Sequence, residues 1–283
     1  MSGASLVDGL AARMGYVSQV AAKLTVVALQ DTGTLAVTCS GGTPTITTAL
    51  TGLGTDHTSH AGVPIIYYAK IDIAGLSADS EYTWTVSKNG NTVSGSFRTM
   101  PADNADFSFV MATCEACDIP APANGVSLLR SYIEAQTSPP VHFYAHIDDN
   151  IYADLERAWG APATRSGDVT TGLTLTKPEG DPTGDPQDTG LSGDYCINWA
   201  RYFGLLPDDK YTSHADRLWL QRNVPFVAQW GDHEVASNWN RGVAGTGGSW
   251  YGGPSGYSAD GAFAASPANF FDNISVPNWE ALF

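Results

Sequence analysis

The sequence predicts a chain in two parts, a small β-sandwich followed by a layered α/β (α+β) domain. In the first third, short runs of β-branched and aromatic residues are separated by Gly, Asp and Ser, which is the rhythm of antiparallel strands. Later the pattern changes to strand, helix, strand, helix, strand, which is typical of a layered α/β fold. The predicted division is an N-terminal extension (1–22), a sandwich (23–101) and a second domain (102–283).

Five strands make up the predicted sandwich, and a hairpin turn joins the last two. Tyr82 and Trp84 share one face of their strand, because side chains alternate along a strand. Asn89-Gly90 predicts a tight hairpin turn, since both residues tolerate a positive φ. The spacing from Leu76 to Tyr82 is similar to that of the corner tyrosine in fibronectin-type sandwiches, so we expect a fibronectin-like domain. The predicted strands cover residues 24–29, 34–38, 63–68, 81–86 and 92–98.

The second part alternates buried strands with helices and contains two long loops. Loops of this length are functional or mobile. In the first loop, Asp181, Asp185 and Asp188 would suit calcium, but they lack the spacing of an EF-hand, and a solvated acidic loop is the preferred interpretation. The predicted strands are 107–112, 141–147 and 224–230, the helices 125–136 and 194–220, and the loops 166–193 and 242–261.

Composition and charge exclude several classes of protein. Only 15% of the 283 residues are charged, against a usual share of roughly 25%, while Gly (30) and Pro (16) are frequent. Acidic residues outnumber basic ones by 29 to 14, and the net charge of −15 excludes nucleic-acid binding as a main role. No stretch reaches the roughly 20 apolar residues of a membrane span. The N-terminus lacks the pattern of a signal peptide.

Each predicted strand of the second part is followed by side chains capable of chemistry. Cys114 follows the first strand, Asp149 and Tyr152 the second, and Asp232 and His233 the third. Taken singly, each has a plain structural role, as a buried thiol, a packing aromatic ring or a helix-capping carboxylate. However, the carboxyl ends of strands in an open α/β sheet meet at one edge, where ligands bind. The coincidence across three strands therefore predicts one convergent site.

Three segments carry a resemblance to a known family. Residues 148–154 (DDNIYAD) are similar to the GDxIYAD motif of the alkaline phosphatase D-like (PhoD-like) metallophosphoesterases, which are related to purple acid phosphatases. Residues 230–239 (WGDHEVASNW) are similar to the family motif WDDHEVxNNW, and residues 109–114 (FVMATC) to its strand ending in Ser-Cys. The resemblance runs from about Lys23 to Phe271 and implies a metallophosphoesterase-type layered sheet behind the fibronectin-like sandwich.

The resemblance also implies a two-metal site that hydrolyses phosphate mono- or diesters of small molecules. It makes Asp149 the carboxylate between two metals, with Cys114 and Tyr152 binding ferric iron. Asp232 would bind the second ion, calcium or another divalent metal, and His233 would act on the phosphoryl group as a hydrogen-bond donor or acid. Asn238 is a weaker candidate for the second ion. Members of the family are exported, so the resemblance implies an extracytoplasmic protein, periplasmic or secreted.

Two departures from the family pattern shape the expectations. Asp148 stands where the family has Gly. The family also closes its metal site with later histidines, whereas the last histidine here is His233. We therefore expect the domain 102–283 to be incomplete at its C-terminus, or completed by a second polypeptide. His146 is one earlier histidine that would approach the site, although burial within its strand is the preferred interpretation.

Two other functions remain open. A non-catalytic binding or structural protein, such as an assembly or surface component, would keep the phosphoesterase scaffold without the late ligands. A calcium-binding adhesive module would depend on Asp181 and Asp185 and would be indifferent to Cys114.

Overall fold

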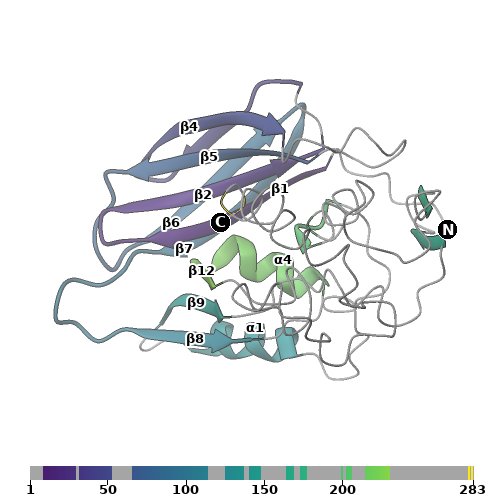
Figure 1. Ribbon diagram of the computed structural model, residues 1–283. Helices are drawn as coiled ribbons and strands as arrows, with labels where there is room; N and C mark the ends of the chain where they lie inside the picture. Colours follow the sequence, from purple (N-terminus) through teal and green to yellow (C-terminus); the bar gives the residue numbers. More distant parts are fainter. Residues whose placement is uncertain are drawn as a thin grey trace, which may run out of the picture.

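The chain folds into a β-sandwich and a parallel three-stranded sheet, with helix α4 (His214–Asn223) between them (Figure 1). The computed structural model describes residues 9–29, 32–52, 66–113, 125–136, 140–147, 164–168, 173–176, 199, 202–205, 214–229, 280 and 282. None of the helices in these ranges is long and apolar enough to cross a lipid bilayer.

Two antiparallel sheets form the first part of the molecule. One has the strand order β1-β2-β5-β4 and the other β3-β6-β7. This is the order of the two sheets in an immunoglobulin constant-type sandwich. The narrower likeness to fibronectin stays a prediction. The strands are β1 (Leu10–Val17), β2 (Ala21–Ala28), β3 (Ala36–Cys39), β4 (Thr43–Gly52), β5 (Tyr67–Ala74), β6 (Glu81–Lys88) and β7 (Asn91–Arg98).

The two sheets share one apolar core. Met14 and Leu24 from the first sheet pack with Trp84 and Phe97 from the second, and all four are almost fully buried. Tyr82 and Trp84 lie on the buried face of β6, as predicted. Because each strand turns alternate residues inward, the sandwich is held by burial of one face from each sheet.

The strand bounds differ from the predicted ones at three places. β1 lies in the segment predicted to precede the sandwich, because its buried Arg13 breaks the apolar alternation that signals a strand. β4 was not predicted, since its threonine-rich sequence alternates little in hydrophobicity. β5 begins at Tyr67 and not at Val63, because its inward residues alternate with outward Lys70 and Asp72.

The predicted turn and corner are both present. Asn89 and Gly90 have φ values of 51° and 82°, and the flanking residues Lys88 and Asn91 pair across the hairpin. The hydroxyl oxygen of Tyr82 accepts a hydrogen bond from the backbone N–H of Ser77 at 2.7 Å. This bond ties the chain entering β6 to the strand itself, as in the tyrosine corner of immunoglobulin-like sandwiches.

The second part contains the predicted parallel sheet, in the order β12-β9-β8. The alternation of strands with helices is confirmed. The helix predicted over 194–220 is interrupted, however: the chain turns at Gly204, with φ at 68°, and α4 begins only at His214. Glycine tolerates the left-handed conformation that ends a helix. The elements are β8 (Ser108–Ala112), α1 (Gly125–Ala135), β9 (Val141–Ile147), α4 and β12 (Phe226–Gln229).

A small hairpin lies in a region predicted to be loop. Strands β10 (Thr164–Asp168) and β11 (Leu173–Thr176) pair antiparallel, and they overlap the predicted loop 166–193.

Both helices pack on the same face of the parallel sheet. Tyr144, Leu220 and Phe226 are buried there, and the apolar side of α1 adds Leu129 and Ile133. The opposite face is apolar and open within the part of the chain that the structure describes. Its most exposed large side chains are Phe107 (49%), Phe109 (49%), Met111 (61%) and Val227 (44%).

Replacing Tyr82 by Phe should destabilise the sandwich by about 1 kcal/mol, because the Ser77 N–H loses its acceptor while the ring stays in place. The free energy of unfolding, measured in urea, checks this. Tyr16→Phe is the control, since that ring is 61% exposed. Equal stabilities of the Tyr82 variant and the unmodified chain would contradict the assigned corner.

The contact between α1 and α4 should weaken at low pH. Asp216 accepts hydrogen bonds from the Ser127 hydroxyl and from Arg130 Nη1, and these hold the pKa of its carboxyl below the usual 3.8. A lowered folded-state pKa contributes stability that is fully present above the unfolded value and is lost as the pH falls below it. Asp216→Asn should therefore be less stable at pH 7, with the deficit shrinking below about pH 4. Urea unfolding of this variant and of Asp106→Asn, an exposed carboxylate, at pH 7 and pH 3 makes the comparison.

Candidate functional site

The three parallel strands end level with one another. Ala112 of β8 pairs with His146 of β9, and Gln229 of β12 pairs with Ile147, the last residue of β9. Neighbouring strands lie about 4.8 Å apart, so the three strand ends span about 10 Å. The segments that follow β8, β9 and β12 therefore leave the sheet from one edge.

The five predicted site residues come directly after these ends. Cys114 follows Ala112 by two residues, Asp149 follows Ile147 by two, and Asp232 follows Gln229 by three. Tyr152 and His233 stand in the same two later segments. All five lie outside the described residues, as do Asn238, Asp181, Asp185 and Asp188. The structure brings together the strand ends from which these segments continue. That the five side chains meet in space stays a prediction.

A metal centre at this edge would be built by the segments beyond the strands. Within the described ranges, no group of three or more His, Cys, Asp or Glu residues is placed to hold a metal ion. The predicted donors are a thiolate, a phenolate and two carboxylates. Carboxylates and phenolates are ligands for hard cations, and a thiolate favours a transition metal. By its chemistry alone, this predicted donor set would suit a pair of unlike cations.

His146 belongs to the core, as the preferred interpretation of the sequence held. Its side chain is fully buried, and its ring packs against Tyr144 at 5.7 Å and Phe226 at 6.1 Å between centroids. It therefore lies on the face of the sheet that the helices cover.

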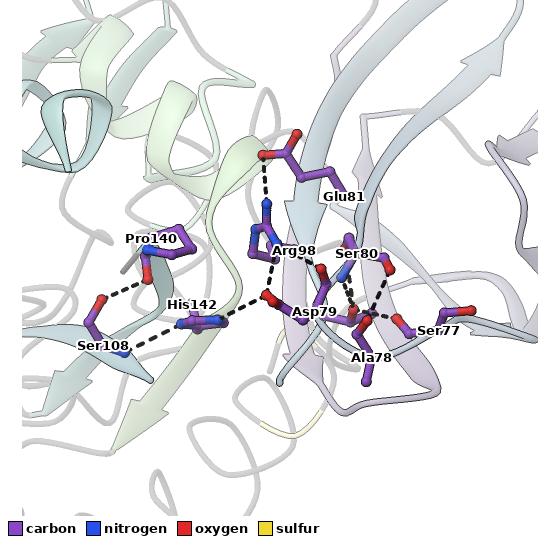
Figure 2. Close-up of polar contacts among 10 residues, drawn as sticks. Ser77, Ala78, Asp79, Ser80, Glu81, Arg98, Ser108, Pro140 and His142 are labelled. Atoms are coloured by element: carbon purple, nitrogen blue, oxygen red, sulfur yellow. Dashed lines mark hydrogen bonds and ion pairs between the residues drawn. The ribbon is translucent and has the colours of Figure 1, made fainter. Parts of the chain in front are cut away.

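His142 connects the opposite end of β9 to the sandwich (Figure 2). The ring is 2% exposed, and its Nδ1 accepts a hydrogen bond from the Ser108 N–H at 3.4 Å. Its Nε2 lies 3.7 Å from Oδ1 of Asp79, which Arg98 holds at 2.7 Å. Because Nδ1 is an acceptor, the proton of the neutral ring is on Nε2, facing the carboxylate. The sandwich therefore lies beside the start of β9, at the other end of this strand from the candidate site.

A second contact with the sandwich lies where α4 leads into β12, at residues 222–226, here called the α4–β12 junction. The indole Nε1 of Trp84 donates to the Arg222 carbonyl at 3.2 Å. Both the backbone N–H and the hydroxyl of Ser96 donate to Oδ1 of Asn223, each at 3.1 Å. Strands β6 and β7 thus supply donors to the Arg222 carbonyl and to the Asn223 side chain at the end of α4.

Arg13 of β1 supports the same junction from a buried position. Its guanidinium carbon lies 4.6 Å from the ring centroid of Phe226 and 5.6 Å from that of Phe203, and its Nη2 donates to the Leu282 carbonyl at 2.8 Å. Burial lowers the pKa of Arg13 to about 10, partly offset by Tyr202. Sequence reasoning missed this residue, although a lone cation among apolar strand residues was a signal.

The level strand ends can be tested by cross-linking. Ile147→Cys combined with Gln229→Cys should form a disulfide under mild oxidation, because the two residues are partners on neighbouring strands. Met111→Cys with Gln229→Cys should not, since β8 and β12 are separated by β9. Peptide mapping by mass spectrometry identifies the bonds. A cross-link in the second pair alone would contradict the strand order.

Comparison with known proteins gives similarity in structure only. No family model matches the sequence, and no curated protein matches it. Over 84% of its length the chain is similar to the solved structure of PhoD, with 16% identity and a TM-score of 0.46. Over 97% it is similar to a purple acid phosphatase from yellow lupin (Lupinus luteus) seeds, with 15% identity and a TM-score of 0.45. The chain spans only 41% and 40% of the length of these two proteins.

Proposed function

We propose that the chain is a metal-dependent phosphoesterase that hydrolyses phosphate mono- or diesters at the carboxyl edge of the β8-β9-β12 sheet. The observation that carries the proposal is the level ending of three parallel strands, each followed within a few residues by potential metal ligands. A chance scatter of Cys, Asp and Tyr would not be expected to fall after all three strands at one edge.

The proposed roles divide the five residues by their chemistry. Asp149, after the central strand, would help to hold both cations, because a carboxylate offers two oxygens. Cys114 and Tyr152 would supply the thiolate and phenolate for ferric iron, and Asp232 would hold calcium or another divalent ion. Such a pair of cations would supply charge to polarise the phosphate ester and to acidify a water molecule. His233 orients the phosphoryl group and holds a proton for the departing oxygen.

Charge makes cations necessary in this proposal. The net charge of −15 gives the protein a field that repels a phosphate ester. Asp149 and Asp232 add negative charge at the site itself, so bound cations must dominate the local potential for an anionic substrate to enter. Removal of metal by a chelator should therefore abolish both substrate binding and turnover.

Location and partners belong to the proposal as well. An extracytoplasmic site of action, periplasmic or secreted, follows from the resemblance of the motifs. The second polypeptide that would complete the domain stays a prediction. Among the described residues, the open apolar face with Phe109, Met111 and Val227 is the surface that such a polypeptide would cover.

Asp149→Ala should abolish hydrolysis of p-nitrophenyl phosphate and of its bis ester, measured with iron and calcium added. The expected loss exceeds the about 10–100-fold that removal of a ligand's hydrogen-bonding partner costs, because a ligand itself is lost. Asp148→Gly is the matched control, since the resembling motif has Gly at that position and activity should persist.

Metal analysis of the unmodified chain separates the alternatives. Bound iron together with turnover that depends on Asp149 supports the phosphoesterase. Bound iron without turnover of either ester favours the non-catalytic binding protein. Absence of both metal and turnover contradicts the proposed function.

A further inference from the structure

We propose that the β-sandwich positions the candidate site by fixing the α4–β12 junction, with Gly95 and Ser96 of β7 as positioning residues. The inference rests on the proposed function, because it concerns the metal-binding segment that follows β12. By this inference the β-sandwich contributes to metal affinity, a role that neither the sequence motifs nor the parallel sheet indicates.

Gly95 permits the closest approach between the two parts. A Cβ atom at this position would overlap the carbonyl oxygen of Arg222 and would lie 2.8 Å from both the Arg222 carbonyl carbon and Cζ2 of Trp84. Gly95 is not among the glycines with a positive φ, so its backbone conformation is open to any residue. Glycine is therefore required at position 95 because the end of α4 leaves no room for a Cβ atom, and not because the backbone needs a positive φ.

The end of α4 depends on donors from the sandwich. The last carbonyl groups of a helix have no partner within the helix. The indole N–H of Trp84 donates to the Arg222 carbonyl, and Ser96 provides two donors to the side chain of Asn223. Asn223 in turn donates to the Trp219 carbonyl at 2.8 Å, which ties the contact back into the helix.

The connection from α4 to β12 is too short to absorb a shift. Only Val224 and Pro225 separate the two elements, and the Pro225 carbonyl accepts a hydrogen bond from the Tyr144 N–H at 2.8 Å. Arg13 lies over Phe226, the first residue of β12. A displacement of the Arg222 carbonyl therefore moves the start of β12 relative to β9.

β12 itself has only four residues before the segment with Asp232 and His233 begins. The chain continues from β12 into the segment with Asp232 and from β9 into the segment with Asp149, so a displaced β12 changes where one segment starts relative to the other. Ligands that must hold a cation at fixed distances lose affinity when one side of the site is moved. The sandwich thus acts on metal binding through Asp232, without contact with the metal.

Gly95→Ala tests the inference in the full-length chain. Its affinity for calcium, measured by calorimetry on protein loaded with iron, should fall by about tenfold, with kcat falling and KM changing less. Gly15→Ala is the matched control, because this glycine also lies in a sandwich strand but a Cβ there would be 3.4 Å from the nearest atom, the Lys23 carbonyl oxygen. It should bind calcium as the unmodified chain does.

The outcomes separate this inference from the proposed function. If the unmodified chain binds neither iron nor calcium, the proposed function fails. If it binds both and folded Gly95→Ala binds them equally well, the positioning role alone is overturned. Circular dichroism establishes that the variant is folded.

Ser96 decides the question if Gly95→Ala does not fold. Ser96→Ala removes one of the two donors to Asn223 without adding volume, and it should weaken calcium binding a few-fold. Ser96→Thr keeps the hydroxyl and should restore the affinity. Equal affinity of the Ala and Thr variants would overturn the positioning role.

Discussion

The hydrogen-bonded register of β9 with its two neighbours is the constraint on which the molecule depends. Ala112 pairs with His146, and Ile147 pairs with Gln229, so the three strands end together. A shift of one residue would turn Tyr144 from the helix-covered face to the open face, which the burial of Tyr144 forbids. The packing that stabilises the core therefore also decides where the segments after the strands begin.

Much of the second part could be predicted from the sequence, because buried parallel strands appear as continuous apolar runs. β8, β9, α1 and β12 lie within two residues of their predicted positions. β1 and β4 were missed because Arg13 and a series of threonines hide the alternation. For the site, the sequence predicts five residues, and the structure establishes only the common edge. The contact between Trp84 and Arg222 joins residues 138 apart in the chain, and no local pattern signals it.

The sandwich is built into the α/β layer and is not a tethered module. It contacts the start of β9 through Asp79 and His142, and the α4–β12 junction through Trp84, Ser96 and Arg13. Domains in one chain more often meet through modest polar surfaces that permit relative motion. Here the contacts include the buried guanidinium of Arg13, which lies over two aromatic rings and donates a hydrogen bond to a backbone carbonyl.

The hydrogen bond from Arg13 to Leu282 has a consequence for biosynthesis, since it joins positions 269 residues apart. As the ribosome extends the polypeptide, Arg13 emerges 269 residues before Leu282, and its charge stays hydrated until Phe226 and Leu282 have followed. The opening strand therefore cannot reach its final surroundings before translation has passed residue 282. During vectorial folding, water therefore surrounds the Arg13 guanidinium first and is displaced only when Phe226 and Leu282 pack against it.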